Sequence, residues 1–522
     1  MPVNPVAPMA GRREWIGLAV LALPCLLYSM DLTVLNLAVP HLAADLKPTS
    51  SQLLWIVDIY GFLVAGSLIT MGTLGDRIGR RKLLMIGAVA FGAASIFAAF
   101  STSAEMLIAA RALLGVAAAT LAPSTLSLLR NMFLDDRQRS FAIGVWIASF
   151  SAGGAIGPLV GGALLEYFWW GSVFLIALPV MALLLVVGPL LLPEYRDPEA
   201  GRLDLTSAAL SLLSVLAVIY GIKQFAEHGA GWLPVAVILA GLIVGFAFVR
   251  RQQRLAIPLI DMSIFRSPAF TASLSINILA FFIAFSAFLF IAQYLQLVLG
   301  MGPLEAGLWT APSAIGFIAG SMLSPAIARR FRPSHVMAGG LLIAALGFAL
   351  LTRIGGPNEL AVVVIGYVVF SVGMAPAFTM TTDLIIGSVA PEKAGAASGI
   401  AETSTEFGGA LGIAVLGSVI TAIYRGSMAD VGAVGTSPEA LNAARDTLGA
   451  AVAMAGQLPT EAGEELLAVA RQSFTEALQL TMALSAVIAV AAAILALILL
   501  RRSQAEVAGS GAVKEPAPQS TG

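Results

Sequence analysis

Five acidic or basic residues stand more than one helical turn inside long apolar stretches of this chain, where charged groups are rare. They are Asp31, Asp58, Arg111, Glu402 and Glu406. A charge near the centre of a bilayer costs about 2.5–3.5 kcal/mol even on insertion scales, so those that are kept usually face a water-filled path or a partner. We therefore interpret the five as candidates for binding a proton or a cation, with paired structural charges as the alternative.

The positions of the acids favour exchange chemistry. Asp31 lies about sixteen residues into its stretch, roughly 24 Å along a helix that rises 1.5 Å per residue. Glu402 and Glu406 are four residues apart and share one helix face. Two stacked carboxylates repel each other, so we expect that they are not both ionised when no cation is bound. A lipophilic cation can compete with a proton for such a charge. Asp383, close to the end of its stretch, is equally well explained as a structural charge.

The composition decides which elements must position these residues. The 522 residues are 58% hydrophobic and 11% charged, against about 25% charged in soluble domains. This predicts an all-α polytopic membrane protein. Apolar runs long enough to span a bilayer occur fourteen times. Their approximate bounds are 15–39, 52–73, 83–101, 105–128, 140–165, 172–192, 204–225, 232–249, 269–299, 305–328, 335–353, 360–386, 395–424 and 477–500.

The basic residues support this count. With fourteen helices, 22 of the 29 lysines and arginines fall in loops on one side, and one helix more or fewer would scramble that segregation. The positive-inside rule places this side in the cytoplasm. We therefore expect a multi-pass protein of a bacterial-type plasma membrane, with both termini cytoplasmic.

Two segments outside the apolar runs carry their own signals. Residues 425–476 contain two helix starts, at Ser437-Pro438-Glu439 and at Leu458-Pro459-Thr460-Glu461. We interpret them as an extracellular helical hairpin, with a disordered loop as the alternative. Residues 503–522 are rich in Gly, Pro and Ser and are expected to be a disordered cytoplasmic tail.

Two glycine-containing stretches complete the pattern. Gly72–Leu83, GTLGDRIGRRKL, is a charged turn between apolar runs, so it must be a tight loop at a membrane face, and its glycines allow close backbone approach. In the fifth run, Gly153, Gly157 and Gly161 fall on one helix face, a spacing that lets helices pack closely in lipid. Pro158 removes a backbone hydrogen bond there and can bend the helix.

These motifs resemble those of a known family. Gly72–Leu83 resembles the major facilitator superfamily signature G-x-L-a-D-R-x-G-R-[RK]-x-x-L, and 153–162 matches the antiporter signature G-x-x-x-G-P-x-x-G-G. Met30–Pro40 is similar to the helix-1 signature of the fourteen-helix drug:proton antiporter branch. Leu107–Gly115 resembles L-x-x-x-R-x-x-Q-G, but Leu114 replaces the glutamine, so one polar partner of that site is missing. Over nearly the whole chain the similarity is closest to QacA/SmvA-like exporters of quaternary ammonium compounds and dyes.

The resemblance implies the fold of that superfamily. A six-helix bundle would span 1–200, two inserted helices 201–254, and a second six-helix bundle 255–502, including the hairpin. It also implies that Asp76 meets the positive N-terminal end of a helix near Gly395 when the inner side is closed, and that Arg77 or Arg80 pairs with Asp135 or Asp136. The implied latch residues are Gly72, Asp76, Arg77, Gly79 and Arg80, and those of the antiporter motif are Gly153, Gly157, Pro158, Gly161 and Gly162.

Together these features predict a proton-coupled exporter of lipophilic cations that works by alternating access. Asp31 would bind the proton and the cation, Glu402 and Glu406 would supply counter-charge, Asp58 would tune the pathway, and Arg111 would hold Asp31 or its neighbours. We expect a monomer in contact with membrane lipids, with no cofactor, metal or nucleic-acid partner. No Gly-Lys dipeptide occurs, which excludes a Walker A motif. The sequence also lacks a nucleophile–base cluster of the kind that would indicate an enzyme. Export of an endogenous lipid or antibiotic, or a non-transporting sensor, are the alternatives.

Overall fold

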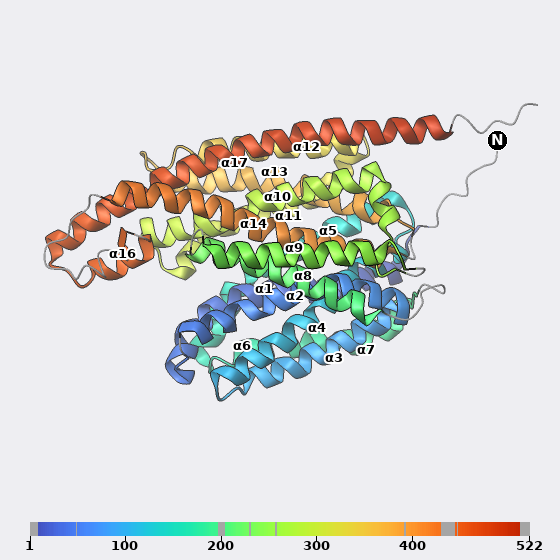
Figure 1. The fold of residues 1–522 in the computed structure, drawn as a ribbon, viewed down its shortest axis with the longest axis horizontal. Coiled ribbons are helices and arrows are strands. Elements are labelled where there is room, and N and C mark those ends of the chain that lie inside the picture. Colours follow the sequence, from blue (N-terminus) through green and yellow to red (C-terminus); the bar gives the residue numbers. More distant parts are fainter. Residues whose placement is uncertain are drawn as a thin grey trace, which may run out of the picture.

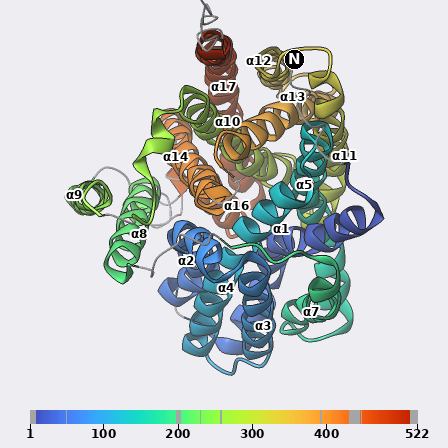
Figure 2. The same ribbon diagram turned by 90° about the vertical axis from the view of Figure 1, so that its right-hand side faces the viewer.

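The computed structural model describes residues 9–48, 50–196, 204–228, 231–255, 258–390, 393–429, 444–445 and 447–511. The first part of the chain is a bundle of helices that lie side by side (Figures 1 and 2). Its helices are α1 (Arg12–Leu46), α2 (Ser50–Ile78), α3 (Arg80–Ala99), α4 (Ala104–Met132), α5 (Asp136–Tyr167), α6 (Ser172–Leu175) and α7 (Ala177–Leu191).

The remaining helices form a pair and a second bundle. The pair is α8 (Leu205–His228) and α9 (Trp232–Gln252). The second bundle contains the 3₁₀ turn η1 (Met262–Arg266), α10 (Pro268–Gln293), the π-helical turn η2 (Tyr294–Val298), α11 (Pro303–Ala328), α12 (Pro333–Leu351), α13 (Glu359–Gly387), α14 (Ala394–Met428), α16 (Leu448–Ala455) and α17 (Thr460–Gly511).

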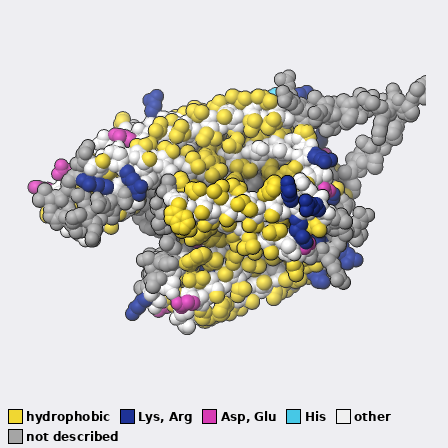
Figure 3. Space-filling model, in the orientation of Figure 1, with side chains coloured by type: hydrophobic (Ala, Val, Ile, Leu, Met, Phe, Trp, Pro, Cys, Tyr) yellow, Lys and Arg dark blue, Asp and Glu magenta, His cyan; other side chains and the backbone are white. Residues whose placement is uncertain are grey.

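Thirteen helices among the described residues are long and apolar enough to cross a membrane. The sequence predicts fourteen, and the difference is α5, which is not among the thirteen. It is nevertheless 32 residues long and packs inside the molecule, against α1 and α11. An apolar belt covers the middle of the surface in Figure 3, and Lys and Arg side chains gather at one end of the pair α8–α9. We call the end of the molecule that contains Gly79, Arg139 and Lys393 the basic end.

The two bundles contact each other through equivalent helices. The second helix of the first bundle, α2, packs against α14, the fifth spanning helix of the second bundle. In the same way α5, the fifth helix of the first bundle, packs against α11, the second spanning helix of the second bundle. This reciprocal pattern is what two parallel repeats would produce. The inserted helix α8 lies along the α2–α14 seam, where Phe62, Ala65 and Ile219 form a small buried cluster that Ala410 covers.

The segment 425–476 differs in part from the expected hairpin. The helix start at Thr460 is confirmed, but α17 runs on without a break into the last membrane helix. α16 packs against α17, and the predicted start at Ser437 lies outside the described residues. The tail also differs from the expectation, because residues 503–511 continue α17 and only 512–522 lie outside the description.

Candidate binding and coupling site

The centre of the site is an ion pair between α1 and α4. Arg111, whose side chain is fully buried, donates from Nη1 to Oδ2 of Asp31 at 2.5 Å. Its Nε donates to the backbone oxygen of Ile56 on α2 at 3.1 Å. α4 can approach α2 this closely because Gly115 has no side chain: a Cβ there would lie 2.6 Å from the backbone oxygen of Tyr60. The structure thus brings together two of the predicted residues, Asp31 and Arg111.

Tyr60 lies directly under this ion pair. The Arg111 Cζ atom is 4.6 Å from the centre of the Tyr60 ring, a cation–π distance. Among the described residues, neither the buried Tyr60 hydroxyl nor Arg111 Nη2 finds a hydrogen-bond partner. Buried polar atoms of this kind usually pair with water or an ion. A cavity of about 20 Å³ that borders Asp31, lined also by Ser95 and Phe174, has room for about one water molecule.

The second half contributes Glu406, which reaches this site through Tyr28. The Tyr28 hydroxyl donates to Oε1 of Glu406 at 3.1 Å, a contact between α1 and α14. Tyr28 precedes Asp31 by three residues and therefore shares its helix face. Glu402 lies one turn before Glu406 on α14 and is half-buried. The sequence reasoning missed Tyr28, although a polar group one turn from Asp31 in an apolar helix is a signal that could have found it.

Asp58 lies on a different face of α2 from Tyr60. It is half-buried on α2, two residues from Tyr60, so its side chain leaves the helix about 200° around from that of Tyr60. Ile56 and Tyr60, four residues apart, are the α2 residues whose contacts with Arg111 the structure gives. A tuning role for Asp58 stays a prediction.

The glycines of α5 support the part of α1 that carries Asp31. A Cβ on Gly153 would collide with the backbone oxygen of Leu26, and a Cβ on Gly161 would lie 2.7 Å from the Val34 side chain. These two α1 residues are on either side of Asp31 in sequence. Gly157 is buried between them on α5, whereas Gly162 has nothing within 4 Å of a Cβ position. Pro158 lies within α5, but its side chain is outside the description.

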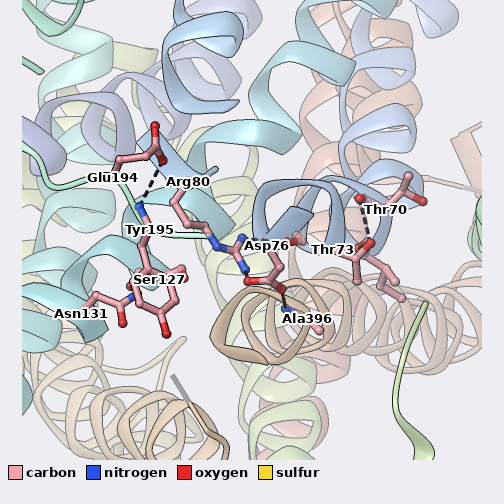
Figure 4. Close-up of polar contacts among 11 residues, drawn as sticks. Thr70, Thr73, Asp76, Arg80, Ser127, Asn131, Glu194, Tyr195 and Ala396 are labelled. Carbon is pink, nitrogen blue, oxygen red and sulfur yellow. Dashed lines mark hydrogen bonds and ion pairs between the residues drawn. The ribbon is translucent and has the colours of Figure 1, made fainter. Parts of the chain in front are cut away.

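At the basic end, Asp76 joins the two halves. Its Oδ2 accepts a hydrogen bond from the backbone N–H of Ala396 at 3.2 Å, in the first turn of α14 (Figure 4). The free N–H groups and the dipole of a helix N-terminus favour an anion at this position. Gly72 lies so close to the Gly395 backbone that no side chain fits between the two helices. This is the place near Gly395 that the family resemblance implies for Asp76.

Arg80 does not make the contact that the sequence suggested. It is fully buried, forms an ion pair with Asp76, and donates from Nη1 to the Gly72 oxygen at 2.7 Å. The expected pairing of Arg80 with Asp135 or Asp136 is therefore wrong. Asp135 instead caps α5 by accepting from the first backbone N–H groups of that helix. Arg77 lies in the last turn of α2, and its expected pairing stays a prediction.

A residue that the sequence reasoning missed completes the loop. Glu194, after α7, accepts hydrogen bonds from the backbone N–H groups of Arg81 and Lys82, both at 3.1 Å, and so caps the start of α3 (Figure 4 shows its neighbourhood). Gly79 makes the cap possible, because its φ of 112° is unfavourable for other residues and a Cβ would lie 2.6 Å from Glu194.

A second charged contact joins the halves at the same end. Asp383 on α13 accepts from Nε of Arg139 at 3.3 Å and from the hydroxyl of Ser140, both on α5. Arg139 also pairs with Asp136 at 2.8 Å. Together with the Asp76 contact, this gives two polar contacts between the halves at the basic end, one between α2 and α14 and one between α5 and α13.

The sequence itself matches a family over most of its length. Residues 21–413 match the Major Facilitator Superfamily. The chain belongs to this superfamily. Its relatives include the multidrug efflux pump LfrA of Mycolicibacterium smegmatis, 43% identical over 499 residues that cover 96% of this chain and 99% of LfrA. The methyl viologen resistance protein SmvA of Salmonella typhimurium is 34% identical, with 88% and 93% covered.

Other relatives in the superfamily handle different compounds. The tetracenomycin C resistance and export protein of Streptomyces glaucescens is 30% identical over 95% of this chain and 93% of its own. Among solved structures, the fold is similar to the human organic anion transporter MFSD10, with a TM-score of 0.59 and 15% identity over 91% of this chain and 99% of that one. This protein is thus a multi-pass membrane transporter of the superfamily, related to drug efflux pumps.

Proposed function

We propose that this protein is a proton-coupled antiporter that exports lipophilic cations, such as quaternary ammonium compounds and dyes, by alternating access. The observation that carries the proposal is the buried Asp31–Arg111 pair on α1 and α4, with Glu406 of the other half tied to the same helix α1. Carboxylates from both halves then surround one place in the membrane interior. A proton gradient supplies the energy, and no cofactor takes part.

The pairing of Asp31 with Arg111 supports coupling. Arg111 Nη1 occupies Oδ2 of Asp31, so exchange of a proton for a cation at this carboxylate requires Arg111 to move away or the site to rearrange. Glu402 and Glu406 would offer counter-charge to the cation while Asp31 is neutral.

The orientation follows from charge. We place the basic end and both termini in the cytoplasm of a bacterial-type plasma membrane, by the positive-inside rule. The contacts of Asp76 and Asp383 then close the inner side. Alternating access requires both to break in the opposite state. The latch function of Asp76 is part of this proposal.

The test is efflux of ethidium driven by a pH gradient in proteoliposomes. Asp31→Asn should abolish proton-driven efflux, because the amide neither binds a proton nor carries the charge that attracts the cation. Asp45→Asn is a matched control, since Asp45 lies on the same helix and accepts from Nε1 of Trp170 at 2.7 Å outside the site. If Asp31→Asn exports ethidium as the unchanged protein does, the assignment fails.

The alternative is export of an endogenous lipid or antibiotic. The name of the Streptomyces glaucescens relative, with its export of tetracenomycin C, favours this candidate. Accumulation of a cell lipid or metabolite in a deletion strain, together with no counterflow of cations in proteoliposomes, would support it over the first proposal.

A further inference from the structure

Tyr28 connects the two halves one helical turn from Asp31. Its hydroxyl donates to Glu406 across the boundary between α1 and α14. The Tyr28 ring is buried, 6.1 Å from the Tyr60 ring on α2 and 5.7 Å from the Phe150 ring on α5, both measured between centroids. Neighbours from two helices therefore fix the direction in which the phenol points.

The carboxylate of Glu406 needs such a fixed donor. A glutamate side chain has several rotatable bonds, and holding it in one place costs side-chain entropy. A hydrogen bond to a charged group is stronger than one between neutral groups and can offset that cost. A quaternary ammonium ion has no N–H with which to orient a carboxylate, so the protein must orient it beforehand.

We propose that Tyr28 is the positioning residue for Glu406, and that it holds this carboxylate on the side of the site where Asp31 approaches from the other half. This inference rests on the proposed function and names how the second half presents its charge to the cation. Tyr28 acts through Glu406, and its hydroxyl proton is not the one that is transported. Because it shares a helix face with Asp31, any movement of α1 that changes the Asp31–Arg111 pair also moves the donor to Glu406.

The test is a double-mutant cycle on ethidium efflux in proteoliposomes. Tyr28→Phe keeps the ring and removes the donor, and it should raise KM about tenfold while kcat changes less than threefold. A tenfold change in KM corresponds to about 1.4 kcal/mol, close to the smallest contribution expected of a hydrogen bond to a charged group. Glu406→Gln should raise KM further. If Tyr28 acts through Glu406, adding Tyr28→Phe to Glu406→Gln changes KM by less than twofold, since the carboxylate is already gone.

Tyr424→Phe is the matched control. Tyr424 is a buried tyrosine on α14, the helix of Glu406, and its hydroxyl donates to the backbone oxygen of Ala444 at 2.9 Å, away from the site. Any effect it has should multiply with that of Glu406→Gln. Glu406→Asp, which withdraws the carboxylate from the phenol by one methylene, should raise KM as Tyr28→Phe does.

Three results would overturn the inference: an unchanged KM in Tyr28→Phe, an unchanged KM in Glu406→Asp, or effects of Tyr28→Phe and Glu406→Gln that multiply. These results differ from a failure of the proposed function. In that case the unchanged protein itself would show no efflux of ethidium driven by a pH gradient, and no KM could be measured for any variant.

Discussion

Replacing Asp76 by asparagine separates two contributions of one carboxylate. The ion pair with Arg80 lies within the first half and joins two residues that are four positions apart. The hydrogen bond from the Ala396 N–H joins the two halves and exists only while the basic end is closed. Asp76→Asn therefore affects folding through the first contact and the conformational equilibrium through the second.

The magnitudes follow from these two contacts. An anion at a partly buried helix N-terminus contributes up to about 2 kcal/mol, which corresponds to roughly a 30-fold shift in the equilibrium between the two states. A buried Arg80 without its carboxylate lowers the free energy of unfolding of the state with the closed basic end by about 3–5 kcal/mol. The asparagine side chain keeps the shape and can still accept one hydrogen bond, so these values are upper bounds.

Steady-state efflux of ethidium in proteoliposomes measures the effect. We expect kcat to fall about tenfold, because the closed basic end is less populated, while the equilibrium Kd for ethidium in detergent changes less than threefold. Asp204→Asn is the control, since Asp204 loses an ion pair of 2.8 Å with Arg251 at the same end but within the inserted helix pair. A variant whose Kd rises while kcat is unchanged would refute the latch.

Two further predictions concern stability. Gly153→Ala should lower the unfolding temperature and the rate of efflux, because its Cβ collides with the Leu26 backbone and overpacking costs about 1–3 kcal/mol. Gly162→Ala is the control: it has open space around it and should leave the unfolding temperature unchanged or raise it. Equal effects of the two substitutions would contradict the α1–α5 contact. The Arg251 hydrogen bond lowers the pKa of Asp204 from 3.8 to about 2, so its stabilisation is present above about pH 4 and is lost as the pH falls toward 2. When the pH is lowered from about 5 to about 3, the unfolding temperature should fall less for Asp204→Asn than for the unchanged protein. An equal fall in the two proteins would exclude this contribution.

Local patterns in the sequence were sufficient to predict most of the fold. Apolar length placed the spanning helices, and the cap at Thr460 marked the start of α17. The same patterns did not predict that α17 continues unbroken through the membrane, because a soluble helix and a membrane helix joined without a breaker have no boundary signal. They also placed the acids within the spanning helices, since that depends only on position along a helix.

Partners across the molecule were the part that local patterns could not supply. Tyr28 and Glu406 are 378 positions apart, and only the docking of α1 on α14 makes them neighbours. Arg80 was expected to reach the next loop, but the close approach of α2 and α14 buries it, and a buried charge takes the carboxylate nearest to it, Asp76.

By itself, the sequence determined a helical membrane transporter with acids inside its apolar helices, because hydrophobicity, charge asymmetry and glycine spacing act locally along each helix. The tertiary structure decided which charge meets which: Asp31 with Arg111, Asp76 with the start of α14, and Asp383 with Arg139. The physical reason is that a desolvated charge must pair with whatever packing brings within a few ångströms, and packing between helices far apart in the chain is a property of the whole fold.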